Sequence, residues 1–422
     1  MHAHKNAVVG DVAVDLHPFI RKYNDGRVER ILRSSYVPAS EDPAASRGGV
    51  ATRDVVIDGG AAASARLFLP PNAASREGRL PVVVYIHGGS FCTESAFCRT
   101  YHRYAASLAS RAGALVVSVE YRLAPEHPVP AAHDDAWAAL RWAASLSDPW
   151  LARYADPSRT FVAGDSAGGH IAYRTAVRAS SRDEGDGIGI EGLVVIHPYF
   201  WGADMLPSEA TWEGGSVITP HGAGILWPFV TAGQAGNDDP RIDPPADEVA
   251  SLACRRVLVA VAEKDLLRDR GRLLAARMRS CGGRRSVTLV ESEGEDHGFH
   301  LYSPLRATSR KLMDAVVQFI NHQGVFLGRL DSQARRGPIA TQMNSSDVDR
   351  MEQNAKSRPS AATAAVNASL TIGRVKARKK GYGLSLGRTR GIPNNSVTLN
   401  GLEMEAVAGL SPPFSLQCIG LD

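Results

Sequence analysis

A serine at position 166 lies in Gly164-Asp-Ser-Ala-Gly168, a small-residue segment of the G-x-S-x-G type. It follows a short apolar run at 161–163 and precedes a helix-like stretch, the strand–turn–helix order that a nucleophilic serine requires. The glycines permit a tight turn that exposes the hydroxyl, and the N-terminus of the helix favours negative charge beside it. A small-residue turn that contains a serine by chance is the alternative, but this context favours a nucleophile.

A serine nucleophile needs a neighbouring base, and the base needs a carboxylate to orient it. Asp265 follows the apolar run at 256–262, and His297 follows the run at 286–291. One chain order known for such sites is serine, acid, histidine, with the last two residues on loops after late strands. We therefore expect Ser166, Asp265 and His297 to form a catalytic triad.

Other acidic and histidine residues compete for these roles. Glu263 and Asp269 flank Asp265, and Asp269 is better placed as an acidic residue in the first turn of the next helix. His300 could replace His297 as the base, although the His297-Gly298 pair favours His297. A metal site built on His297 and His300 lacks an intervening Glu and a nearby third ligand, so we expect no metal or other cofactor.

The segment His87-Gly-Gly-Ser90 ends the first apolar run. Consecutive glycines allow backbone N–H groups to converge on an oxyanion, so we expect Gly88, Gly89 and Ala167 to form the oxyanion hole. His87 is expected to support this loop by hydrogen bonding. The nearby Cys92 and Cys98 could line the pocket, but buried apolar packing is the commoner role of such residues.

Alternating apolar runs and helical patterns must position these residues. Strands are expected at 81–86, 114–119, 161–163, 192–196, 256–262 and 286–291, and helices at 101–112, 131–145, 169–179, 268–279 and 308–321. Continuous apolar runs are typical of strands that are covered on both faces. The fold class is therefore α/β, with a mostly parallel central sheet flanked by helices.

Two irregular regions interrupt this alternation. Residues 12–58 combine a helix-like start with strand-like pieces at 28–32 and 55–57, and residues 198–245 are rich in Gly, Pro and Trp. Long insertions in a compact domain often cover active sites. We predict that a cap forms from about residues 1–58 and 198–245.

The chain has 422 residues and a formal net charge of +4, which at first suggests an acidic partner such as nucleic acid. Residues 324–422, however, contain 13 Lys and Arg against 7 Asp and Glu, whereas residues 1–323 contain 35 against 37. The basic excess therefore belongs to a low-complexity tail, 324–422, that we expect to be disordered, following a catalytic domain at 1–323. No nucleic-acid partner is expected.

Other features indicate the compartment. No apolar run is long enough to span a membrane, the first residues lack a signal-like apolar core, and five cysteines show no CxxC spacing. These features favour a cytoplasmic protein without a membrane partner, with nuclear presence also possible for its basic tail. The oligomeric state is left open.

Several segments in order resemble the hormone-sensitive-lipase branch of the α/β-hydrolases: His87-Gly-Gly-Ser-Phe91, Glu120-Tyr-Arg-Leu-Ala-Pro-Glu-His127, Gly164-Asp-Ser-Ala-Gly168 and Asp265-Leu-Leu-Arg-Asp269. Others, including His197-Pro-Tyr-Phe-Trp-Gly202 and Asp239-Pro-Arg-Ile242, are similar to the plant carboxylesterases. The resemblance covers about residues 10–322. It implies a serine carboxylesterase of small esters that uses the triad and oxyanion residues named above.

The resemblance also leaves two alternatives. In most relatives the fourth residue of the segment that begins at His87 is glycine, whereas this chain has Ser90. The similar gibberellin receptors share that serine but have lost the triad histidine. The presence of His297 favours an enzyme over such a hormone or metabolite receptor. The hydroxyisoflavanone-type dehydratases are also similar, but they carry a threonine in the loop where this chain has Gly88 and Gly89.

Overall fold

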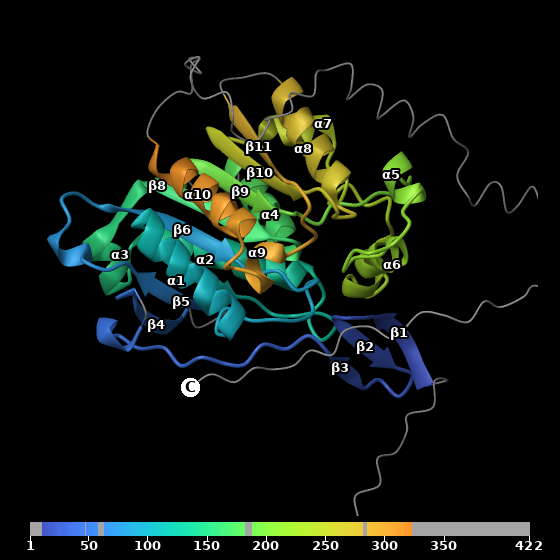
Figure 1. Cartoon of the computed structure of the whole chain (residues 1–422), viewed down its shortest axis with the longest axis horizontal. Helices are drawn as coiled ribbons and strands as arrows, with labels where there is room; N and C mark the ends of the chain where they lie inside the picture. The colour runs from blue at the N-terminus through green and yellow to red at the C-terminus, as the bar shows by residue number, and fades with distance from the viewer. Residues whose placement is uncertain (1–10, 47, 58–62, 182–187, 282–284, 323–422) are drawn as a thin grey trace, which may run out of the picture. The chain divides into compact units, whose positions relative to one another are not determined.

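An eight-stranded β-sheet forms the centre of the protein (Figure 1). The computed structural model describes residues 11–46, 48–57, 63–181, 188–281 and 285–322. The strand order is β11-β10-β9-β8-β6-β7-β5-β4, and only the pairs made by β5 are antiparallel. These strands are β4 (Ala51–Val56), β5 (Ser64–Leu69), β6 (Leu80–Ile86), β7 (Leu115–Glu120), β8 (Ala155–Asp165), β9 (Gly192–Ile196), β10 (Arg256–Ala262) and β11 (Ser286–Ser292).

The inner strands are covered on both faces, since every residue of β6 and β9 is buried. This is the arrangement that their continuous apolar runs predict. All six strands expected from such runs are confirmed, although β8 begins six residues earlier than the run at 161–163. The predicted mostly parallel sheet is therefore confirmed, and the carboxyl ends of its parallel strands lie along one edge.

Helices cover the two faces of the sheet in separate groups. The helices α1, α9 and α10 pack on one face, and α2, α4 and α8 pack on the other (Figure 1). All five predicted helices are confirmed, with ends that shift by one or two residues. The helices are α1 (Arg99–Ala112), α2 (Pro130–Ser145), α3 (Pro149–Tyr154), α4 (Ala167–Ser180), α8 (Arg268–Ser280), α9 (Phe299–Tyr302) and α10 (Ala307–Asn321).

The N-terminal segment folds differently from the expectation. Its helix-like start is wrong, because Val12 to Leu16 alternate between more and less exposed side chains, a two-residue period that suits a strand. The segment forms a separate antiparallel sheet in the order β1-β2-β3. Its strands are β1 (Val12–Leu16), β2 (Ile20–Tyr23) and β3 (Val28–Arg30). The piece expected at 55–57 overlaps β4, which is the edge strand of the central sheet and not part of the cap.

The second irregular region lies between β9 and β10. It contains α5 (Pro207–Ala210) and α6 (Pro220–Val230), and it is followed by α7 (Ala246–Ser251). All described residues belong to one compact unit of the chain. The predicted tail, 324–422, lies outside the described residues. Within them, no helix is long and apolar enough to cross a membrane.

Candidate active site

Ser166 lies between β8 and α4 at the carboxyl edge of the sheet. Its backbone has φ 53° and ψ −122°, a conformation that side-chain-bearing residues rarely adopt and that often occurs at functional sites. The flanking glycines make this turn possible. A Cβ on Gly164 would lie 2.3 Å from the carbonyl oxygen of Gly168, and one on Gly168 would lie 2.1 Å from that of Ile86. Close backbone packing therefore requires glycine at both positions.

The structure brings Ser166, His297 and Asp265 together, although 131 residues separate the first two in sequence. His297 Nε2 lies 2.8 Å from Ser166 Oγ, and His297 Nδ1 lies 2.8 Å from Asp265 Oδ2. The other oxygen of Asp265 accepts a hydrogen bond from the N–H of Leu267 at 3.0 Å. All three side chains are at least nine-tenths buried. A proton can therefore pass from the serine to the imidazole along a preformed hydrogen bond.

Electrostatics in this group favour a charged imidazole next to an ionised carboxylate. Burial alone lowers the pKa of His297, but the adjacent Asp265 carboxylate outweighs burial, so that the pKa of His297 is raised. Burial alone raises the pKa of Asp265. The charge and hydrogen bond of His297 lower this pKa, and the net shift is downward. Asp265 thus stays ionised and stabilises the protonated His297.

Gly88 does not have the position expected of an oxyanion donor. Its N–H donates to the hydroxyl of Tyr101 at 2.9 Å, and that hydroxyl donates to Asp165 Oδ2 at 2.8 Å. Tyr85 donates to the other oxygen of Asp165 at 2.7 Å. The prediction for Gly88 is corrected, since its only backbone hydrogen is already bonded. Neither tyrosine could be found from the sequence, because no motif links them to the serine turn.

The next two residues of the loop are better placed. Gly89 and Ser90 have φ +107° and 54°, and neither N–H has a protein acceptor in the described part of the chain. Ala167 is the first residue of α4, a position whose N–H has no intrahelical acceptor. Ser90, Ser166 and Ala167 line one pocket. His87 supports the loop as expected, with its Nδ1 2.7 Å from the carbonyl oxygen of Gly88.

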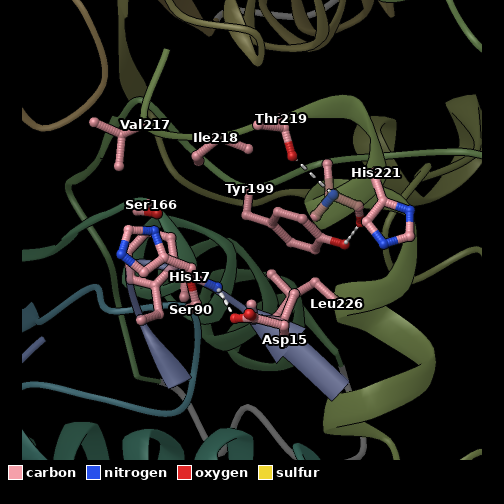
Figure 2. A pocket seen from close by; sticks show the side chains of 15 residues that line it. Asp15, His17, Ser90, Ser166, Tyr199, Val217, Ile218, Thr219, His221 and Leu226 are labelled. Atoms are coloured by element: carbon pink, nitrogen blue, oxygen red, sulfur yellow. Dashed lines mark hydrogen bonds between the residues drawn. The ribbon is translucent and has the colours of Figure 1, made fainter. Parts of the chain in front are cut away.

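The pocket beside Ser166 has a volume of about 60 Å³ and lies between the carboxyl edge of the sheet and both irregular regions (Figure 2). Asp15 of β1 and the turn residues His17 and Phe19 line it from the N-terminal segment, and residues from around α6 include Ile218 and Leu226. His17 lines the same pocket as Ser166 and Ser90 (Figure 2). The sequence offered no signal for these contacts because they join distant segments.

The aromatic residues around this site have different roles. Tyr199 lines it, and its hydroxyl donates to the carbonyl oxygen of Ala223 at 3.1 Å. Phe91 and Trp227 instead pack around the buried ring of His170. Cys92 and Cys98 are buried and are not among the residues that line the pocket. This agrees with the role in apolar packing that was the alternative for them.

The positions of the other acidic and histidine residues near the triad separate them from the roles of Asp265 and His297. Asp269 lies in the first turn of α8, as expected, and bonds to Arg268. His300 is buried but has no hydrogen bond to Ser166 or Asp265. Asp296 accepts hydrogen bonds from Ser216 Oγ at 2.7 Å and the N–H of Val217 at 3.1 Å. It therefore links the histidine loop to the second irregular region.

His197 is a further buried residue beside the triad. Its Nδ1 accepts a hydrogen bond from the N–H of Gly298 at 3.3 Å, next to His297. One potential ligand atom from each of His197, Asp265 and His297 lies within 4.8 Å of the others, a spacing that a metal ion could bridge. The hydrogen bond between Asp265 and His297 already engages two of these side chains, so the arrangement suits proton transfer better than metal binding.

Comparison with known proteins places the chain in a family. Residues 83–301 match the family described as the alpha/beta hydrolase fold. The chain is 41% identical over 320 residues to 2-hydroxyisoflavanone dehydratase of Glycyrrhiza echinata, covering 72% of this chain and 95% of that protein. It is 37% identical over 321 residues to probable carboxylesterase 5 of Arabidopsis thaliana, covering 74% and 98%.

Solved structures give the same result. The hyperthermophilic esterase from the archaeon Pyrobaculum calidifontis matches with a TM-score of 0.54 and 32% identity, covering 64% of this chain and 84% of that chain. Together with the mostly parallel sheet and the serine turn between β8 and α4, these similarities confirm the resemblance of the motifs. The chain belongs to the α/β-hydrolase family, in the branch that includes plant carboxylesterases.

Proposed function

We propose that this protein is a serine carboxylesterase that hydrolyses small carboxylic esters. The observation that carries the proposal is the buried relay of two 2.8 Å contacts, from Ser166 Oγ to His297 Nε2 and from His297 Nδ1 to Asp265 Oδ2. Relatives named carboxylesterase and a solved esterase support the same activity. A receptor has no need of such a relay.

The reaction begins when His297 Nε2 takes the proton of Ser166 as the hydroxyl oxygen attacks the ester carbonyl. Asp265 holds the imidazole in the tautomer that presents Nε2 as the acceptor, and its charge stabilises the imidazolium. The imidazolium then protonates the departing alcohol, which leaves an acyl group on Ser166. Water, deprotonated by His297, attacks this acyl group, and release of the acid restores the serine.

Backbone N–H groups stabilise the oxyanion in both steps. We assign this role to Gly89 and Ala167, and to Ser90 in place of Gly88, whose N–H bonds to Tyr101. Ser90 and Ala167 support the assignment by lining the pocket next to Ser166. Preorganised donors of this kind contribute about 2.7–4 kcal/mol each to transition-state stabilisation. No metal or organic cofactor takes part in these steps.

The two irregular regions are proposed to form the cap. Support comes from the pocket itself, which both regions line opposite Ser166. Residues 11–46 and 198–245 make up this cap in the described chain, without the edge strand β4. The small volume of the pocket, about 60 Å³, favours short acyl groups over long ones.

A dehydratase acting at the same site is the second candidate, because one relative at 41% identity bears that name. In such a reaction the base would remove a proton from carbon while a hydroxyl group leaves as water, and no acyl-serine would form. The two candidates therefore differ in their need for Ser166 as a nucleophile.

The finer points of cellular context are also proposals. The four cysteines in the described part of the chain are unpaired, which supports a reducing compartment such as the cytoplasm. The catalytic domain is proposed to occupy residues 1–323, with 324–422 as a separate basic tail. Neither part is expected to bind nucleic acid.

A panel of p-nitrophenyl esters of increasing acyl length tests the proposal. We expect hydrolysis of acetate and butyrate esters at rates above those of octanoate and longer esters. Ser166→Ala should lower kcat by several orders of magnitude, whereas Ser158→Ala, in the exposed part of β8, should leave it unchanged. Full activity in Ser166→Ala would exclude the mechanism. Activity on 2-hydroxyisoflavanones without ester hydrolysis would favour the dehydratase.

A further inference from the structure

A second cavity is lined by residues of α1, α9 and α10. These helices cover one face of the central sheet (Figure 1). The cavity has a volume of about 250 Å³, and it shares no lining residue with the pocket at Ser166. Its lining combines cationic side chains with a buried apolar floor that includes Tyr104, Leu312 and Met313. Nothing in the proposed esterase reaction uses this cavity.

Four arginines line the cavity and give it a strong positive charge: Arg99, Arg103, Arg111 and Arg310. The first two are four residues apart on α1, so their side chains project from the same side of that helix. Arg111 pairs with Asp314. Within the described ranges, Arg99, Arg103 and Arg310 have no carboxylate at ion-pair distance. Like charges at this helical spacing repel each other, and an anion bound between them would offset that repulsion.

His300 gives a second, independent indication of a ligand. It lines the cavity, its residue is only 4% exposed, and neither ring nitrogen has a hydrogen-bond partner among the described residues. Buried polar atoms in proteins are nearly always hydrogen-bonded, since an unpaired one costs free energy. Both ring nitrogens have almost no accessible surface, so the ring would have to turn toward the cavity for a ligand oxygen to accept its N–H.

We propose that the cavity binds a small organic molecule that carries a phosphate group. The planar guanidinium groups of Arg103 and Arg310 would hold the phosphate oxygens, since arginine forms paired hydrogen bonds with phosphate. The apolar part of the molecule would lie against Tyr104, Leu312 and Met313. The proposal does not depend on the esterase function, because the two sites share no residue.

Calorimetric titration of the full chain with phenyl phosphate tests this site. We expect saturable binding at one site, weaker binding of inorganic phosphate, and no binding of phenol, which lacks the charge. Arg103→Glu and Arg310→Glu should each weaken phenyl phosphate binding by about tenfold or more. Arg141→Glu is the matched control, since Arg141 is an exposed residue of α2 outside the cavity. The affinity of this variant for phenyl phosphate should be unchanged.

Two further measurements keep the result decisive. Arg103→Gln and Arg310→Gln remove the charge with less disturbance, and circular dichroism shows whether each variant folds. Ser166→Ala should bind phenyl phosphate as the unaltered chain does. Absence of saturable binding, equal affinity in all folded arginine variants, or loss of binding only in Ser166→Ala would each overturn the proposal, the last by moving the ligand to the esterase pocket.

Discussion

The hydroxyl of Tyr101 lies 2.8 Å from Oδ2 of Asp165, the residue immediately before Ser166. The same hydroxyl accepts the N–H of Gly88, so one side chain of α1 joins the loop after β6 to the serine turn after β8. Asp165 is fully inside the protein, and burial raises its pKa to about 6, although hydrogen bonds from two tyrosines oppose this shift. Tyr101 thus sets the distance between the loop that bears Ser90 and the nucleophile.

Tyr101→Phe removes both hydrogen bonds of this hydroxyl. We expect the free energy of unfolding to fall by about 1–3 kcal/mol, because a buried carboxylate and a buried N–H lose a partner. We also expect kcat for a short ester to decrease about tenfold as the loop shifts. Urea unfolding and steady-state kinetics measure the two effects. Tyr104→Phe is the control, because Tyr104 is a buried tyrosine of the same helix whose hydroxyl makes no hydrogen bond in the described structure. Equal effects in both variants would contradict the role of the Tyr101 hydroxyl in positioning the loop.

The ionisation of His297 governs the pH dependence of the reaction. Only the neutral imidazole can accept the serine proton, and the raised pKa of His297 keeps it protonated up to a pH above 6.5. The value of kcat/KM should therefore increase with pH through a midpoint above 6.5. Asp265→Asn removes the charge that raises this pKa, so that burial dominates and the midpoint moves to lower pH. Its rate should also fall by about 10⁴-fold.

Asp296→Asn is the comparison for this pH profile. Asp296 is a smaller contributor to the raised pKa of His297 and does not bond to its ring. A shift in the same direction but of smaller size is expected. A midpoint that stays in place in Asp265→Asn would contradict the assignment of that carboxylate.

The ion pair between Arg270 and Glu209 links α8 to the proposed cap. The two side chains are 4% and 0% exposed, and their atoms approach to 2.7 Å. Glu209→Ala leaves a buried guanidinium without its carboxylate, and we expect the free energy of unfolding to fall by about 3–5 kcal/mol. Glu213→Ala, an exposed acidic residue of the same region, should change stability by less than about 0.5 kcal/mol. Similar denaturation midpoints for the two variants would show that the pair does not hold the cap.

The sequence was sufficient for the six parallel strands of the central sheet and for the three residues of the relay. Strand β5 was not predicted, and β4 was anticipated only in part, as a piece of the cap. Strands β6, β7, β9 and β10 are buried on both faces, so their apolar runs are continuous and easily detected. Asp265 and His297 follow such strands, and the carboxyl ends of parallel strands meet at one edge. That topology explains why side chains far apart in sequence could be predicted to meet.

Two kinds of feature could not be predicted from the sequence: the direction in which a backbone N–H points, and contacts between residues that are far apart in the chain. A glycine pair shows that a backbone can approach a ligand closely, but not which N–H points toward it; Gly88 points toward Tyr101 instead. The short strands β1 and β2 have few residues to show a period. The link between Tyr101 and Asp165 spans 64 residues and belongs to no local motif.

The central claim is that Ser166 is a nucleophile activated by His297. It is tested most directly by treating the full chain with an alkyl fluorophosphonate and locating the adduct by peptide mass spectrometry. We predict one adduct per chain, on Ser166, and its near-complete loss in His297→Ala at the same exposure time. Absence of any adduct on Ser166, or labelling that proceeds equally fast in His297→Ala, would contradict the claim.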